Sequence, residues 1–153
     1  MSSFPYLKWF MKTGRRKNRI EALQILFQLD LNQDLSTQKA LNHFQEFYSL
    51  EKNTLDEFTH RLVLGVTEKL SEIDTLLKKA SENWRPDRMA AVDRNALRLG
   101  VYEILFCDDI PATVSINEMI EVSKQFGSES SPSFINGILD KIRQLHPNPN
   151  KAK

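Results

Sequence analysis

The sequence predicts an all-α protein with six to seven helices in two stacked helical subdomains. Apolar residues recur at three- and four-residue spacing along most of the chain, which is the period of one face of an α-helix. The chain has 153 residues but only five glycines, and its long segments lack the turn signals that separate short strands. This length suits one domain, or two small lobes that share one core.

The N-terminal subdomain is expected to cover residues 15–83, after a disordered extension over residues 1–14. Pro5 and Gly14 interrupt regular structure in that extension. The third predicted helix should be one long core helix, because seven apolar residues follow one another at near-heptad spacing. The three helices expected in this half cover residues 15 to about 33, 36 to about 49, and 54 to about 81.

The C-terminal subdomain is expected to cover residues 84–145, followed by a disordered tail over residues 146–153. Trp84 and the Pro86 that follows it interrupt the apolar periodicity and mark the junction between the two halves. Gly127 is a natural helix end, since glycine adopts the left-handed conformation at little cost. The helices expected here cover residues 87 to 106, with a short turn at its start as an alternative, 111 to 126, and 131 to 145.

Basic residues are concentrated at the start of the chain. The net charge is only +1, yet the first 20 residues contain six basic residues and no acidic one, and the remainder carries −5. A basic segment on a mildly acidic body is typical of anion binding, and nucleic acid is the commonest large polyanion. A solvated terminus that improves solubility would explain the same charges.

No catalytic, metal or cofactor site is expected. The three histidines and the single cysteine are too widely spaced to form a metal site or a nucleophile–base pair. No glycine-rich phosphate-binding loop is present. Glu118 and Glu121 are three residues apart, which on a helix is more typical of a solvated face or a partner contact than of acid–base catalysis.

The composition gives no sign of a membrane or an oxidising compartment. No apolar run approaches the length of about 20 residues that a membrane helix needs. The first ten residues lack the continuous apolar stretch of a signal peptide. One cysteine allows no internal disulfide, so the cytoplasm is the expected location.

The first predicted helix has an arrangement suited to RNA. If it begins near Arg15, then Arg15 and Arg19 lie one turn apart, and Arg16 begins an adjacent stripe that reaches Phe27. Arginine binds phosphates bidentately and stacks on bases, and an aromatic ring can stack on an unpaired base, which favours single-stranded RNA. In the alternative interpretation, Phe27 belongs to the core and the arginines only solvate a helix end.

Four segments also carry a family resemblance, and they occur in a consistent order. They are RRKNRIEALQILF at 15–27, VDRNALRLGVYE at 92–103, the residues Ile110-Pro111, Ile116-Asn117-Glu118 and Lys124-Gln125-Phe126-Gly127, and FINGILDK at 134–141. Together they resemble the NusB family of transcription antitermination proteins, from about Arg15 to Ile142. One segment would be a weak signal, but four in order make a chance match improbable.

The resemblance implies a fold of two helical subdomains and a function without catalysis. A protein of this kind would bind the boxA element of nascent ribosomal RNA transcripts as single-stranded RNA. It would do so together with NusE, a ribosomal protein, and would support the antitermination complex on RNA polymerase. No cofactor is implied.

The resemblance also implies roles for individual residues. Arg98, Tyr102 and Glu103 are interpreted as structural. The residues expected to contact RNA are Arg15, Arg16, Lys17, Arg19, Phe27, Phe126 and Phe134, although core packing explains the last two equally well. The residues expected to face NusE are Asp87, Asp93 and Glu118.

Three positions depart from the family pattern. Phe27 stands where tyrosine is usual, so stacking could persist but a hydroxyl hydrogen bond could not. Ile20 replaces a position that is often acidic, and Ser130 stands where aspartate is common. The loss of that aspartate removes a charge near the expected RNA path.

Two other functions are compatible with the sequence. The chain could be a self-associating helical scaffold, such as a homodimer, that binds no RNA. It could also be a NusB-like domain tied to an RNA methyltransferase, although the chain ends after the helical region and its last residues read as a natural tail. The segment before Met11 has no family counterpart, so either Met1 or Met11 is a candidate start.

Overall fold

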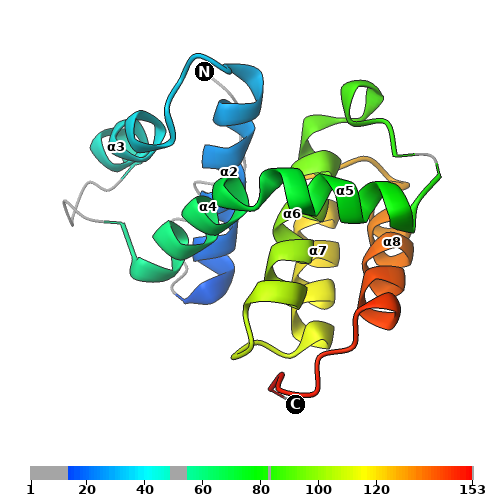
Figure 1. Ribbon diagram of the computed structural model, residues 1–153. Helices are drawn as coiled ribbons and strands as arrows, with labels where there is room; N and C mark the ends of the chain where they lie inside the picture. Colours follow the sequence, from blue (N-terminus) through cyan, green and yellow to red (C-terminus); the bar gives the residue numbers. More distant parts are fainter. Residues whose placement is uncertain (1–13, 49–54, 83, 153) are drawn as a thin grey trace.

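The computed structural model describes residues 14–48, 55–82 and 84–152, and within these ranges every regular element is helical (Figure 1). The predicted all-α class is confirmed. The elements are α2 (Arg15–Leu31), α3 (Thr37–Tyr48), α4 (Glu57–Glu68), α5 (Leu70–Ala80), the 3₁₀ turn η1 (Pro86–Arg88), α6 (Ala91–Phe106), α7 (Ala112–Phe126) and α8 (Ser131–Leu145).

Helix α6 is the centre of the molecule. It contacts α2, α4 and α5 on one side and α7 and α8 on the other, and the last two helices run beside it in Figure 1. Leu97, Leu99 and Val101 in its middle are fully buried. α3 contacts α2 and α4, and lies at the edge of the molecule. The buried apolar side chains form one continuous core, so helices from both halves of the sequence share it.

The long helix predicted over residues 54–81 is two helices, and this part of the prediction is wrong. The chain leaves helical geometry at Lys69, with φ −101° and ψ 11°, between α4 and α5. α4 buries Leu62 and Val66 in contact with α2 and α6, whereas α5 buries Ile73 and Leu77 in contact with α6 and α8. Both helices present an apolar stripe to α6, and each also contacts a further helix, α2 in the case of α4 and α8 in the case of α5. The near-heptad spacing of apolar residues continues across the break.

Two glycines allow close approach between helices. A Cβ atom on Gly65 of α4 would lie 2.0 Å from the Cζ atom of Tyr102 on α6. A Cβ atom on Gly100 of α6 would lie 2.6 Å from a methyl carbon of Leu139 on α8. A side chain at either position would require the Tyr102 ring or the Leu139 side chain to move, or the helices to separate, because protein interiors are close-packed.

A polar cluster joins the C-terminal end of α2 to α5 and α6. Arg94 forms an ion pair of 2.5 Å with Asp30, and the side-chain amide of Asn95 donates to the same carboxylate over 3.1 Å. Arg98 pairs with Asp74 over 2.9 Å. These contacts explain Arg94 and Asn95 of the DRN motif, and they agree with the structural role expected for Arg98.

The chain beyond α8 contacts the C-terminal end of α6, although the sequence predicts a disordered tail there. The Nζ atom of Lys151 donates to the backbone carbonyls of Glu103 and Cys107, over 2.8 and 2.7 Å. The Asn148 side chain donates to the carboxylate of Asp108 over 2.8 Å. Both carbonyls also accept a backbone N–H, from Cys107 and Ile110, so the lysine adds a second donor to each at the negative end of the helix dipole.

The predicted boundary between subdomains at Trp84 remains a prediction. α5 precedes Trp84 in the sequence, yet it contacts α6 and α8 as well as α4. The predicted extension over residues 1–14 lies outside the described residues except for Gly14. None of the helices in the described ranges is long and apolar enough to cross a membrane.

Candidate nucleic-acid interface

The candidate interface begins at the N-terminal end of α2. Gly14 has a φ of +94°, a conformation that glycine adopts readily, and α2 begins at the next residue. The first turns of α2 carry Arg15, Arg16, Lys17 and Arg19, with no acidic residue in the first turn. Cations at this end oppose the helix dipole, at a cost of about 0.3–1 kcal/mol each. The three arginines find their stabilising partners on other elements, and Lys17 pairs within α2.

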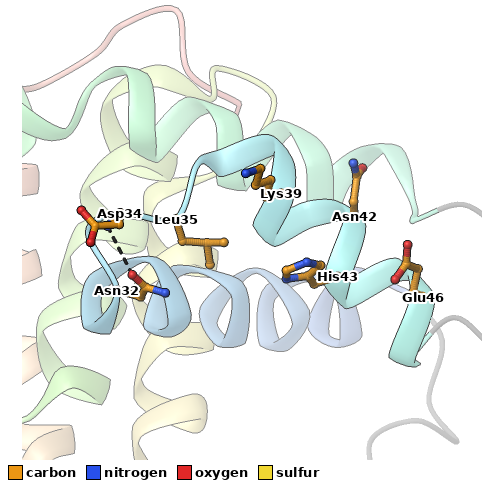
Figure 2. Close-up of a pocket in the computed structure, with 7 residues that line it drawn as sticks. All are labelled: Asn32, Asp34, Leu35, Lys39, Asn42, His43 and Glu46. Carbon is orange, nitrogen blue, oxygen red and sulfur yellow. Dashed lines mark hydrogen bonds between the residues drawn. The ribbon is translucent and has the colours of Figure 1, made fainter.

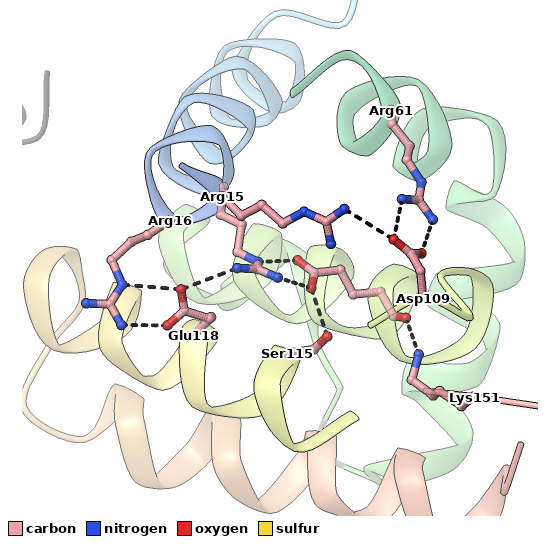
Figure 3. A network of polar contacts seen from close by, with 9 residues as sticks. Arg15, Arg16, Arg61, Asp109, Ser115, Glu118 and Lys151 are labelled. Atoms are coloured by element: carbon pink, nitrogen blue, oxygen red, sulfur yellow. Dashed lines mark hydrogen bonds and ion pairs between the residues drawn. The ribbon is translucent and has the colours of Figure 1, made fainter. Parts of the chain in front are cut away.

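Arg19 is held inside the protein by acidic groups of α6 and α7. Its Nε and Nη2 atoms donate to the two oxygens of Glu103 over 2.8 and 2.9 Å, and its Nη1 atom donates to Glu118 over 3.3 Å. The hydroxyl of Ser115 also donates to Glu103, over 2.8 Å (Figure 3). The Arg19 and Glu103 side chains are 3% and 0% exposed.

This burial gives Arg19 a structural role and leaves it poorly placed for the direct RNA contact that the sequence predicts. A guanidinium that is 3% exposed and hydrogen-bonded to two carboxylates presents no donor to a ligand at the surface. Arg19 is a structural residue that fixes the start of α2 against α6 and α7. Glu103, which the sequence interpretation made structural, is its principal partner.

Arg16 is partly exposed and pairs with Glu118. Its Nη2 and Nε atoms donate to the two Glu118 oxygens over 2.6 and 3.2 Å (Figure 3). The Arg16 side chain is 42% exposed and Glu118 is 15% exposed. The hydrogen bond to Glu118 raises the pKa of Arg16 above its ordinary value. Because Arg16 and Arg19 use both of its oxygens, Glu118 positions these two arginines, which makes it less suited to the predicted contact with NusE.

Arg15 belongs to a second cluster, on the side of α2 that faces α4. Its Nη2 atom lies 3.2 Å from an oxygen of Asp109, and its guanidinium lies 4.3 Å from the ring centroid of Phe58. Arg61 of α4 donates to both Asp109 oxygens, over 2.6 and 3.1 Å (Figure 3). The hydrogen bonds from Arg61, and then from Arg15, hold the pKa of Asp109 well below its usual range. Lys17 is closest to Glu21, with 3.9 Å between the charged atoms.

Sequence reasoning missed Arg61 and Asp109. Arg61 is 48 residues before Asp109 and has no lysine or arginine near it in the sequence that would draw attention to it. Only the packing of α4 against α2 brings it beside Arg15. Asp109 follows α6 in a segment whose sequence signals only a helix end.

The three predicted aromatic contacts are half-buried. Phe27 lies on α2 and retains part of its surface in solvent. Phe126 ends α7 and Phe134 lies in the first turns of α8, and both pack against the core. Phe126 and Phe134 therefore serve the fold in part, and the exposed surface of the three rings is what could meet a base.

The acidic residues expected to face NusE do not gather at one place. Asp87 is exposed in η1, and Asp93 is half-buried in the first turn of α6. Asp93 is ten positions before Glu103, the partner of Arg19, which is a distance of about 15 Å along α6. The Oδ1 atom of Asp93 is buried and has no hydrogen-bond partner among the described residues. Asp87 and Asp93 thus lie toward the end of α6 opposite to the arginines.

The structure places no set of metal ligands together in the ranges that it describes. No group of three or more histidine, cysteine, aspartate or glutamate side chains there is arranged to hold a metal ion. Cys107 is fully buried, and burial raises the pKa of its thiol to about 11, which disfavours the reactive thiolate.

One open depression lies away from the arginines, between α3 and the C-terminal end of α2 (Figure 2). Its volume is about 460 Å³, and its polar side chains carry charges of both signs. It is lined by Asn32, Asp34, Leu35, Lys39, Asn42, His43 and Glu46. His43 is exposed there, without the paired groups that acid–base chemistry or metal binding needs.

Comparison with known proteins gives a consistent result. The model of the NusB family matches residues 16–144. "Transcription antitermination protein NusB" of Bacillus licheniformis is 45% identical over 129 residues, which cover 84% of this chain and 95% of the relative. The protein of the same name from Bacillus subtilis is 41% identical over 129 residues, with 84% and 94% covered.

Solved structures agree with the sequence comparison. T. maritima NusB superposes with a TM-score of 0.78 at 38% identity, covering 90% of this chain and 96% of that one. A crystal structure of the antitermination factors NusB and NusE in complex with dsRNA gives a TM-score of 0.74 at 27% identity, covering 86% and 97%. With the ordered motifs and the helical architecture, these matches show that the chain belongs to the NusB family.

Proposed function

We propose that this protein is an RNA-binding adaptor that recognises the boxA element of nascent ribosomal RNA together with NusE and supports transcription antitermination. The observation that carries the proposal is the partly exposed pair Arg15 and Arg16 at the start of α2, in a chain of the NusB family. The relatives named above are transcription antitermination proteins, and one structural neighbour was solved with NusE and RNA. The protein would act without catalysis, in the cytoplasm, as part of a complex with RNA polymerase.

The geometry supports direct RNA contact by some of the basic residues and an indirect role for Arg19. Arg15, Arg16 and Lys17 would contact phosphates, because their side chains are between 28% and 49% exposed. Arg19 would act indirectly, since its buried pair with Glu103 fixes the backbone from which its neighbours project. A fixed helix end lowers the ordering cost of binding and so favours affinity.

The exposed parts of Phe27, Phe126 and Phe134 are the proposed stacking surfaces for bases. Base–aromatic stacking contributes about 1–3 kcal/mol per base where the ring is available. Asp87 and Asp93 remain the proposed contacts with NusE, and Glu118 is withdrawn from that set because its oxygens are bound to arginines.

The direct test is RNA binding by the whole chain. Fluorescence anisotropy with a labelled single-stranded boxA-like RNA would be measured with and without NusE, at two salt concentrations. We expect salt-sensitive binding that NusE strengthens, because each phosphate that a cation neutralises releases counterions. A duplex of the same sequence is included because the structural neighbour was solved with dsRNA.

Absence of binding to either RNA, with and without NusE, would contradict the proposal. The self-associating scaffold would then be favoured, and the molecular mass in solution would test it.

A further inference from the structure

The Asp109 carboxylate lies between two arginines from different helices. Its Oδ2 atom is 3.2 Å from Nη2 of Arg15 and 3.1 Å from Nη1 of Arg61, so one oxygen receives donors from both side chains. The second oxygen is 2.6 Å from Nη2 of Arg61. Figure 3 shows the two guanidinium groups converging on this one carboxylate from α2 and α4. An anionic oxygen at that position is therefore recognised by two cations at once.

The aromatic ring of Phe58 helps to keep the arginines together. The guanidinium carbons of Arg15 and Arg61 lie 4.3 and 6.0 Å from its centroid. Such cation–π contacts do not depend on Asp109, so the two side chains should remain neighbours when the carboxylate is displaced. Phe58 is 8% exposed and belongs to the core, so the ring under the cluster of Arg15, Arg61 and Asp109 is held in place.

The cluster is accessible to solvent, unlike the pair formed by Arg19 and Glu103. The side chains of Arg15, Arg61 and Asp109 are 49%, 36% and 46% exposed. Water and salt weaken ion pairs in such positions, so another anion can replace the carboxylate. The low pKa of the Asp109 carboxyl means that it stays charged and keeps both arginines occupied near neutral pH.

A phosphate group is the anion that best fits this position. Arginine forks bind carboxylate and phosphate with the same bidentate geometry, and a phosphate offers more acceptor oxygens than a carboxylate does. Arg15 is already one of the residues proposed to contact RNA, so a phosphate that reaches it also reaches Arg61.

We propose that Arg61 is a further RNA phosphate-binding residue, and that Asp109 occupies the phosphate position between Arg15 and Arg61 in the free protein as an internal competitor. This inference rests on the proposed RNA-binding function. RNA then binds by exchanging one carboxylate for one phosphate, which weakens binding to short or weakly charged ligands. Glu118 does not compete in the same way, because buried Arg19 holds it in place.

The first experiment compares Asp109→Asn with Asp108→Asn. Both changes remove one negative charge, but Asp108 is an exposed residue whose carboxylate receives a hydrogen bond from Asn148. Asp109→Asn should tighten binding of the boxA-like RNA by roughly three- to tenfold, since two exposed ion pairs no longer have to be broken. Asp108→Asn should change the affinity by less than about twofold.

The second experiment removes the new cation. Arg61→Gln should weaken RNA binding and reduce the slope of log affinity against log salt concentration by about 0.7, as the loss of one single-strand phosphate contact would. Arg143→Gln is the matched control, because Arg143 is a 43% exposed arginine that pairs with Asp140 of its own helix. This control should keep the wild-type salt slope. Thermal unfolding of each variant verifies its fold, and Asp109→Ala is a second variant for the competitor.

The outcomes separate this inference from the function on which it rests. RNA binding by the wild-type chain, with affinity unchanged or weakened in Asp109→Asn and Asp109→Ala, would overturn the competitor alone. Equal gains in Asp109→Asn and Asp108→Asn would also overturn it, because net charge would then explain the effect. If the wild-type chain binds no RNA at all, the proposed function fails, and the competitor role fails with it.

Discussion

At the scale of the residue, Arg15, Arg16 and Arg19 differ in burial although they share one short segment. The helical period predicts that Arg15 and Arg19 lie on one side of α2, but it does not show what that side contacts. Glu103 is 84 residues away from Arg19, and neither side chain signals the pairing by itself. The sequence therefore predicted a cationic helix end, and only the tertiary packing distinguishes a structural arginine from its partly exposed neighbours.

Loss of the Arg19 side chain should strongly destabilise the fold. Arg19→Ala leaves the fully buried Glu103 carboxylate without its cation, and breaking a buried pair in this way costs about 3–5 kcal/mol of the free energy of unfolding. Urea denaturation measures this free energy. Arg16→Ala is the control, and it should cost no more than about 1 kcal/mol because the arginine is 42% exposed.

The double variant Arg19→Met/Glu103→Met should recover much of the lost stability, since a buried ion pair can be replaced by apolar groups of similar volume. A cost for Arg19→Ala no larger than that for Arg16→Ala would contradict the structural role.

At the scale of the element, periodicity predicted where helices occur better than where they end. The apolar spacing of residues 54–81 was compatible with one helix. No glycine or proline lies at Lys69 or next to it, so the sequence does not signal the break. The last residues of the chain contain proline and asparagine, which favoured a disordered tail, yet Lys151 donates to two carbonyls at the C-terminal end of α6, those of Glu103 and Cys107. Both differences arise from contacts between segments that are distant in the sequence.

The close contact between α4 and α6 gives a test at this scale. Gly65→Ala should lower the free energy of unfolding by about 1–3 kcal/mol, because the added Cβ would overlap the Tyr102 ring. The matched control is Gly137→Ala on α8, where the added Cβ meets nothing within 4 Å. That change should instead stabilise by roughly 0.5–1 kcal/mol, the usual gain from alanine in a helix.

Thermal or urea denaturation distinguishes the two changes. Equal effects of Gly65→Ala and Gly137→Ala would mean that α4 and α6 can separate without cost, contrary to the packing described here.

At the scale of the whole molecule, the fold class and the basic end were predictable, and the assembled site was not. Apolar period, few glycines and uneven charge predicted a helical protein with an anion-binding end. Arg94, Arg98 and Glu103 of α6 were visible in the sequence, and the structure explains them as anchors for α2 and α5. The site itself combines α2, α4, α7 and the residues after α6, and no local sequence pattern specifies that combination.

We infer that the exposed arginines at the start of α2, Arg15 and Arg16, bind RNA phosphates. The most direct measurement is the slope of log affinity against log salt concentration for single-stranded boxA-like RNA. It compares the wild-type chain, Arg15→Gln/Arg16→Gln and the control Lys78→Gln/Lys79→Gln, which removes the same charge from exposed positions on α5. We predict that the arginine variant binds more weakly with a slope smaller by about 1.4, as expected for two lost single-strand phosphate contacts, and that the control matches the wild type. Identical slopes and affinities in all three proteins would contradict the account.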